Sequence, residues 1–384
     1  MRRGLAAAVL FGVLAAACTP SAPVATPSPS ASGPAKVQVT DKTAGELQAV
    51  LTAQRDALVK RDLGAYQTTF DSQRGAFRRC KQEAFDVAGR QGASSAAPRV
   101  VKAEAYGDTY ARAWVDEGGN GVVRSYFRVQ NGRWIQTEPT ADEVGKEQTK
   151  TFDGIDIDYW TIDDDVIESL GRGTLKAREL ITANQLADTR QPFGIRFYPT
   201  RSVQGLQECS VVGFHIPNAA ANDKYIRFFR YWFTTDLKDL SPTTLTFIQH
   251  EGLHWAQDQF SPGISARLDW WLVEGWPDYI GQSRSTDYKR TVICGFPAPT
   301  YKQLVDGPRT DLPEFPPEEA VRYYAFANTM IEYLYAKFGA AAYKELLVAY
   351  KDTASADRNL PLVLKVTPAD YYAGWLAFAK QKYC

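Results

Sequence analysis

The most chemically specific segment of the sequence is Thr246–Phe260, TFIQHEGLHWAQDQF, which holds two of the three histidines in a chain of 384 residues. Serine and proline precede this segment and Ser-Pro-Gly follows it, so we expect a helix that starts and stops at these residues. On a helix, His250 and His254 lie one turn apart on the same face, with Glu251 beside them. Zinc binds neutral imidazole readily, so this spacing predicts a zinc site.

A zinc site needs a third protein ligand from another part of the chain. The segment LDWWLVEGWPDYIG places Glu274 on a second expected helix twenty residues after His254, with Asp278 one turn later. The two segments together resemble the gluzincin metallopeptidases, whose third ligand comes from an E-x-x-x-D helix. The resemblance implies that Zn²⁺ binds His250, His254 and Glu274, and that Asp278 accepts an imidazole N–H, that of His250. Glu251 would then be the general base.

Pro277 departs from this pattern, because a proline inside a helix removes one backbone hydrogen bond and can kink the helix. A third segment, RYYAFANTMIEYLYAKFG, resembles the aminopeptidase-type gluzincin helix that begins with a catalytic tyrosine. The spacing to Gly339 assigns the oxyanion donor to Tyr324, with Tyr323 as the alternative and ordinary burial as a further interpretation. The aminopeptidase anchor motif is missing before His250, so the sequence does not support aminopeptidase specificity.

The strand-like segment SVVGFHIP contains the third histidine, His215. It could be an edge strand above the metal, to which an extended peptide adds through backbone hydrogen bonds. His215 could donate to an oxyanion there, although a structural or solvent-facing histidine is the favoured interpretation.

The N-terminal segment MRRGLAAAVLFGVLAAAC has two arginines, an apolar run and small residues before Cys18, which is typical of a secretory signal peptide. Thirteen apolar residues are too few to span a hydrocarbon core of about 30 Å. The segment resembles a bacterial lipoprotein signal (residues 1–18). This resemblance implies acylation of Cys18, for example with palmitate, and attachment to the extracytoplasmic face of the cell membrane. The Pro-, Ser- and Ala-rich residues 19–38 are expected to be a disordered tether.

Composition limits the partners and the cysteine chemistry. The 44 Lys and Arg residues equal the 44 Asp and Glu residues, so we expect no nucleic-acid partner. An exported protein favours disulfides among Cys80, Cys209, Cys294 and Cys384. Three pairings are open, and Cys209 with Cys294 is preferred because both cysteines lie in the same half of the chain.

The pattern of elements predicts an α+β protein. A long amphipathic helix from Thr43 and several alternating segments with an Asn131-Gly132 turn predict a helix on an antiparallel sheet over residues 39–150. This pattern resembles the cystatin-like cone of nuclear-transport-factor-like domains. Residues 143–158 are polar and are expected to join the halves. Residues 151–384 contain strands first and helices after, and the gluzincin resemblance implies a zincin-like domain there.

These observations favour a lipid-anchored extracytoplasmic zinc metallopeptidase, a hydrolase acting on a peptide or envelope-protein substrate. The alternative is a non-catalytic cell-envelope binding or assembly lipoprotein that keeps a structural metal site. A weaker alternative is a metal-free helical core with accidental histidines.

Overall fold

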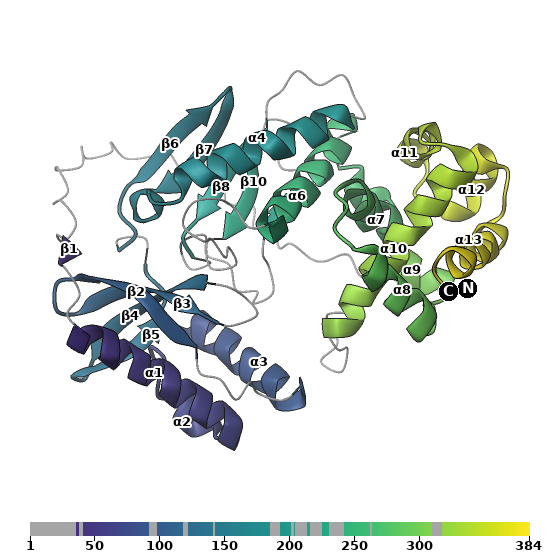
Figure 1. Cartoon of the computed structure of the whole chain (residues 1–384). Helices are drawn as coiled ribbons and strands as arrows, with labels where there is room; N and C mark the ends of the chain where they lie inside the picture. Colours follow the sequence, from purple (N-terminus) through teal and green to yellow (C-terminus); the bar gives the residue numbers. More distant parts are fainter. Residues whose placement is uncertain are drawn as a thin grey trace, which may run out of the picture.

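The computed structural model describes residues 36–37, 41–91, 98–117, 122–140, 143–184, 193–200, 203, 213–215, 225–229, 242–261, 263–308 and 317–384. Within these residues the architecture is α+β, as predicted: a helix-and-sheet unit, a second sheet of mixed direction, and a mainly helical C-terminal region (Figure 1). The expected signal peptide with Cys18 and most of the expected tether lie outside the described residues.

The first unit is a five-stranded antiparallel sheet with three helices packed on one face. The sheet has the order β1-β2-β3-β4-β5. Its elements are α1 (Asp41–Lys60), α2 (Leu63–Gln67), α3 (Gly75–Gln91), β1 (Lys36–Val37), β2 (Arg99–Tyr106), β3 (Tyr110–Asp116), β4 (Val122–Gln130) and β5 (Arg133–Thr137). The predicted turn at Asn131-Gly132 is confirmed, since it joins β4 to β5 with both residues at positive φ, a conformation typical of tight hairpins. Lys36 and Val37 pair with β2, so the end of the expected tether is a short strand and not disordered.

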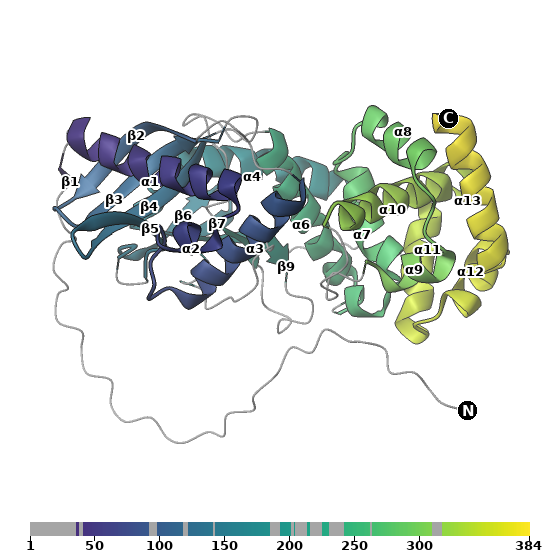
Figure 2. The same cartoon turned by 90° about the horizontal axis from the view of Figure 1, so that it is seen from below.

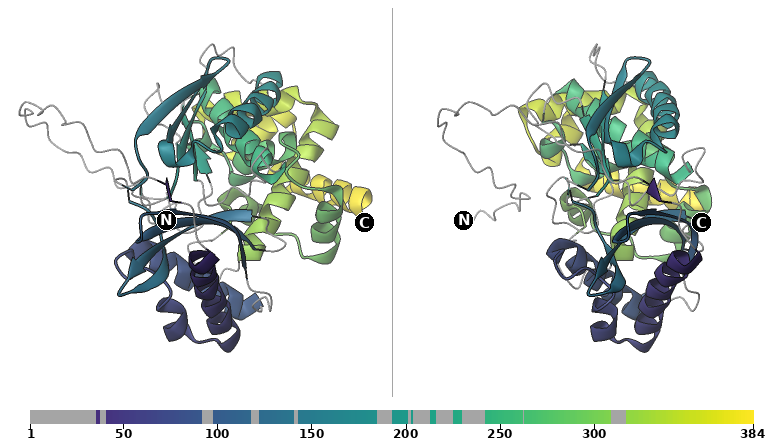
Figure 3. Two further views of the ribbon diagram at one scale, coloured as in Figure 1. Left: turned by 60° about the vertical axis from the view of Figure 1, so that its left-hand side comes forward. Right: turned by 90° about the vertical axis from the view of Figure 1, so that its left-hand side faces the viewer.

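Alternation along β3 and β4 gives this sheet two different faces. Ala113 and Phe127 are fully buried and pack with Leu47 of α1, on the concave side of the sheet (Figure 3). Along each strand every second residue points to the opposite face, as the two-residue period of a strand requires. There Arg112 and Arg124 both donate to the carbonyl oxygen of Ile162, at 2.6 and 2.9 Å. These contacts join the first sheet to the second unit.

The second sheet has the order β6-β7-β8-β10-β9, with the β7–β8 and β8–β10 pairs parallel. Its elements, with the helix that follows the first hairpin, are β6 (Glu147–Phe152), β7 (Ile155–Trp160), α4 (Ile167–Ala183), β8 (Gly194–Tyr198), β9 (Gly213–His215) and β10 (Tyr225–Phe229). Residues 143–158, which we expected to join the halves, contain regular structure that we did not predict, because β6 and β7 form an antiparallel hairpin. An Asp153-Gly154 turn and the buried residues Ile155 and Ile157 were the signals for this hairpin.

The remaining described helices share one hydrophobic core with the second sheet. They are α6 (Pro242–Phe260), α7 (Trp270–Ile280), α8 (Thr286–Gly295), α9 (Tyr301–Asp306), α10 (Pro317–Phe338), α11 (Ala341–Asp352), α12 (Ala356–Leu364) and α13 (Pro368–Tyr383). Figure 2 shows α7–α13 gathered at one end of the molecule, the two sheets at the other, and α6 between them. In the part of the chain that the structure describes, no helix is both long enough and apolar enough to cross a membrane.

The preferred pairing of Cys209 with Cys294 was wrong. Cys294, at the end of α8, forms a disulfide with the C-terminal residue Cys384, and their Cα atoms are 5.7 Å apart. Helix α13 packs against α8, which brings together two cysteines separated by 90 residues. Cys80 also forms a disulfide, with a partner outside the described residues, where Cys209 lies as well.

Candidate metal centre

The two predicted ligand helices pack against each other at the candidate site. Helix α6 carries His250 and His254, and α7 carries Glu274. Close packing behind α7 depends on Gly275, because a Cβ there would lie 2.6 Å from the backbone oxygen of Ala327 on α10. The glycine next to the ligand therefore lets α10 support α7 directly.

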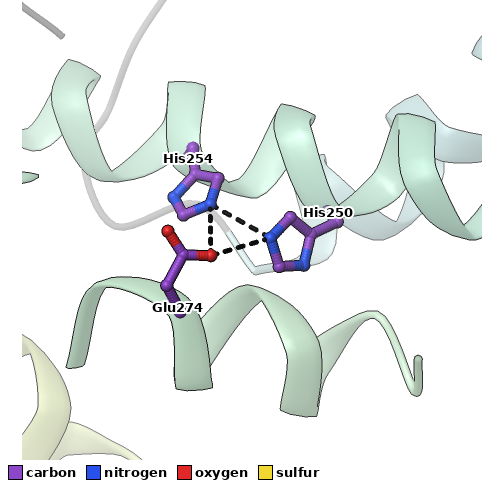
Figure 4. A group of neighbouring side chains, drawn as sticks. All are labelled: His250, His254 and Glu274. Carbon is purple, nitrogen blue, oxygen red and sulfur yellow. Dashed lines mark hydrogen bonds and ion pairs between the residues drawn. The ribbon is translucent and has the colours of Figure 1, made fainter. Parts of the chain in front are cut away.

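Three ligand atoms converge between these two helices (Figure 4). The Nε2 atoms of His250 and His254 are 3.1 Å apart. The Glu274 Oε2 atom is 3.2 Å from the first and 3.3 Å from the second. All three side chains are largely buried, with exposed fractions of 12, 12 and 19%.

The spacing of these atoms fits a tetrahedral divalent ion. Zinc bound at about 2.0–2.1 Å from nitrogen and oxygen ligands holds neighbouring ligand atoms about 3.3–3.4 Å apart. The observed triangle of 3.1 to 3.3 Å nearly matches this edge length. Two imidazoles and one carboxylate also suit zinc chemically, with a fourth position for a water molecule or a substrate. The residues thus form a candidate metal group, and its ion would be held by His250, His254 and Glu274.

A residue that the sequence reasoning missed, Gln257, fixes the orientation of His254. The Gln257 amide nitrogen lies 3.0 Å from the carbonyl oxygen of Val273 and 2.7 Å from the Tyr343 hydroxyl oxygen. Because the nitrogen faces these groups, the amide oxygen faces His254 Nδ1, at 2.9 Å, and accepts its hydrogen. The Nε2 atom of His254 then keeps its lone pair and can bind a metal.

Pro277 explains why the Val273 carbonyl is available to Gln257. Residue 277 would normally donate its backbone N–H to the carbonyl four residues earlier, which is that of Val273, but proline has no N–H. Helix α7 continues through Pro277 to Ile280. The departure from the gluzincin pattern therefore frees an acceptor that helps to hold Gln257.

The charges of this group depend on one another. Burial disfavours a charged imidazole, but the Glu274 carboxylate outweighs burial and raises the pKa of His254 to about 9. Burial also disfavours the charged carboxylate, but the histidines outweigh it and lower the pKa of Glu274. The group therefore attracts positive charge, and binding of a metal cation would release the proton from His254.

Glu251 and Tyr324 lie beside the ligand group. The ring centroids of Tyr324 and His250 are 6.3 Å apart. Glu274, burial and Glu251 together raise the pKa of Tyr324 well above its usual value, so the phenol keeps its proton and can donate. The alternative residue, Tyr323, packs against Trp270, and its pKa is raised by burial and Glu319. Tyr324 is thus the tyrosine next to the ligands, and its catalytic role remains a prediction.

Asp278 lies next to the ligand group but its hydrogen bonds go elsewhere. The carboxylate accepts from Arg284 Nε at 3.2 Å and from the Asn328 side-chain nitrogen at 3.0 Å. Burial raises the pKa of Asp278, and the nearby His250 partly offsets this increase. Between these two described side chains the structure has no hydrogen bond, so the predicted role toward the His250 imidazole remains a prediction. The sequence analysis missed Arg284 and Asn328, because neither residue belongs to a recognisable motif.

The predicted edge strand corresponds to β9, which is the outermost of the described strands of the second sheet and packs against α6. His215 is paired with Ile226 of β10 through the backbone. The rest of the SVVGFHIP segment lies outside the described residues. Comparison of the sequence with models of known protein families and with curated proteins gives no match.

Proposed function

We propose that this protein is an exported, lipid-anchored zinc metallopeptidase. The main support is the triangle of His250, His254 and Glu274 donor atoms, whose edges of 3.1 to 3.3 Å fit a tetrahedral ion. The resemblance of the H-E-x-x-H and E-x-x-x-D segments to gluzincins supports the same function. The lipoprotein-like segment ending at Cys18 supports an extracytoplasmic, membrane-attached location.

The side chains around the ligand group suit amide hydrolysis. Zinc, when bound, lowers the pKa of a coordinated water to about 7 and polarises a carbonyl oxygen. Glu251 accepts a proton from the attacking water and passes it to the leaving amine. Tyr324, whose phenol stays protonated beside Glu274, donates a hydrogen bond to the oxyanion. Gln257 keeps the His254 imidazole in the required tautomer.

The substrate class is a peptide or a protein of the cell envelope. Strand β9 lies at the edge of the described sheet, next to the helix that carries both histidines. An extended peptide can add to such an edge through backbone hydrogen bonds, which brings a peptide bond above the ligands without demanding a particular sequence.

The test combines metal analysis with one conservative substitution. Full-length protein in detergent should retain one zinc per chain after dialysis. Glu251→Gln should retain that zinc but hydrolyse peptides about 10²- to 10⁴-fold more slowly, the usual contribution of a general base. His254→Ala should lose both zinc and hydrolysis. Substoichiometric zinc in the wild type, or equal hydrolysis by Glu251→Gln, would refute the proposal.

A non-catalytic envelope binding or assembly lipoprotein is the competing function. It is favoured by the first unit, which packs firmly on the second through Arg112 and Arg124 but contributes no residue to the candidate metal group. Equal binding of an envelope partner by wild type and Glu251→Gln, with stoichiometric zinc and no cleavage by either, would support this alternative.

A further inference from the structure

A polar cavity of about 510 Å³ lies beside the candidate metal centre, between the end of α4 and helices α7, α8 and α10. One face of α10 leads into it. Tyr324 lies next to His250, Asn328 follows one turn later and Glu332 two turns later, and the last two line the cavity. Four residues of a helix advance about 6 Å along its axis, so the wall of the cavity begins one helical turn beyond Tyr324.

A buried carboxylate holds the guanidinium of Arg284 at the wall of this cavity. Arg284 Nε lies 3.2 and 3.4 Å from the two oxygens of Asp278, which is only 1% exposed. The rings of Tyr288 and Tyr324 flank the guanidinium carbon at 5.8 and 5.4 Å. The hydrogen bonds of the described residues engage Nε, and they leave the terminal atoms Nη1 and Nη2 available. A guanidinium fixed in this way presents a pair of donors that matches the two oxygens of a carboxylate.

The charges around the cavity leave an excess of one positive charge. Lys289 Nζ lies 3.3 Å from Asn328 Oδ1 and 3.8 Å from Glu332, and Glu332 is 2.8 Å from Lys382. The cations outnumber the carboxylates by three to two: Arg284, Lys289 and Lys382 against Asp278 and Glu332. A bound monoanion would balance this set.

We propose that the cavity binds a carboxylate of the substrate, with Arg284 as the two-oxygen donor and Lys289 as the second cation. This proposal rests on the proposed peptidase function for the position of the cleaved bond. The Tyr324 ring lies 6.3 Å from His250 and 5.4 Å from Arg284. An extended peptide advances about 3.4 Å per residue, so the carboxylate lies within about three residues of that bond. It is either the C-terminal carboxylate of a peptide or an acidic side chain.

Peptide binding to an inactive protein tests this proposal. The probes are two libraries of acetylated random hexapeptides, one ending in a free carboxylate and the other in a carboxamide. They are applied to zinc-loaded, full-length Glu251→Gln in detergent, and the retained peptides are quantified by mass spectrometry. Peptides with a carboxylate at the preferred position should be retained about 10- to 100-fold more strongly, the usual contribution of hydrogen bonds to a charged group.

Three further substitutions in the Glu251→Gln background define the site. Arg284→Lys keeps a cation opposite Asp278 but removes the paired donors, and Lys289→Gln leaves the Arg284–Asp278 contact intact, so both should fold and both should lose the preference. Arg290→Gln is the matched control. It removes a cation from α8, the helix that carries Lys289, at a position where Arg290 pairs with the exposed Asp287. Thermal unfolding confirms that each variant is folded.

Each outcome has a distinct meaning. Preference for the free-acid library identifies a C-terminal carboxylate, whereas enrichment of Asp and Glu in both libraries identifies an acidic side chain. Equal retention with and without a carboxylate overturns the proposal, as does a preference that survives in both Arg284→Lys and Lys289→Gln. Because binding is measured without hydrolysis, a carboxylate preference in a protein whose wild type cleaves no peptide refutes the peptidase function alone.

Discussion

Two buried polar clusters of this protein neutralise their carboxylates differently. At the junction of the two sheets, Arg124 donates to Asp163 at 2.8 Å and also pairs with Asp165, and the side chains of Arg124 and Asp163 are completely buried. In the candidate metal centre, Glu274 faces the imidazole nitrogens of His250 and His254. The junction therefore carries a permanent cation of its own, whereas the positive charge opposite Glu274 is a proton on His254, whose pKa is raised to about 9, and a bound metal cation would replace that proton.

This difference distinguishes a structural ion pair from a candidate metal site. Arginine stays charged under all ordinary conditions, so the junction holds its cation as soon as the chain folds. Imidazole can carry a proton, or give it up and bind a metal. We therefore expect the stability that comes from the junction to be independent of metal, and the stability that comes from the metal centre to depend on it.

Breaking the junction should have the largest effect on stability. Arg124→Met leaves the Asp163 carboxylate buried without its cation, so the free energy of unfolding should fall by about 3–5 kcal/mol. Urea denaturation would measure this loss. Arg133→Met, an exposed position in the same sheet, is the control and should change little. The double variant Arg124→Met/Asp163→Asn removes both charges and should regain most of the loss; failure to regain it would show that packing, and not charge, determines the effect.

Asp269, just before α7, is a third buried carboxylate, and it differs from the other two in having a neutral partner. Its partner is the neutral Tyr350 hydroxyl, at 2.8 Å, and burial raises its pKa to about 6 from an ordinary 3.8. The folded state thus keeps this proton to higher pH than the unfolded state does, so stability is lost as pH rises from about 4 to above 6. Relative to Asp269→Asn, zinc-free wild type should lose about 2–3 kcal/mol between pH 4 and 7. If the free energy of unfolding of the two proteins depended on pH in the same way, this prediction would be contradicted.

Zinc should stabilise only proteins with an intact ligand group. At a free concentration one hundred times Kd, zinc should raise the free energy of unfolding by about 2.7 kcal/mol. Glu274→Ala should lose this increment, and Arg124→Met should keep it despite its lower stability. Thermal unfolding in zinc and in chelator would measure both. An increment that persists in Glu274→Ala would place the zinc elsewhere.

Those parts of the candidate metal centre that lie close together in the sequence could be predicted from the sequence. His250 and His254 share a helix, so their relative position follows from helix geometry alone. The assignment of Glu274 depended on the resemblance to gluzincins, because the contact between α6 and α7 is a matter of packing. The Cys294–Cys384 disulfide was missed for the same reason, since it requires α13 to dock on α8. The Asp153-Gly154 hairpin, by contrast, had a readable turn signal.

Gln257 shows a subtler limit. It lies only three residues after His254, on the same helix, yet its role depends on a carbonyl of α7 that Pro277 leaves without its usual donor. A glutamine in a helix has many ordinary explanations, and the proline alone suggested a kink. The function of each residue follows only once the two helices are known to touch.

The smallest expected effect is on zinc affinity, and it tests the contact between Gln257 and α7. Gln257→Leu removes the acceptor that fixes the His254 tautomer, so zinc affinity should fall about 10- to 100-fold, or about 1.4–2.7 kcal/mol. Pro277→Ala restores a backbone donor to Val273 and should weaken affinity by only a few fold, because Gln257 keeps its contact with Tyr343. Competition with a chromophoric chelator would measure both affinities, with Gln259→Leu on the same helix as the control. If Gln257→Leu binds zinc as tightly as Gln259→Leu, then the geometry of α6 alone holds the imidazole, and the metal centre needs no support from α7 beyond Glu274.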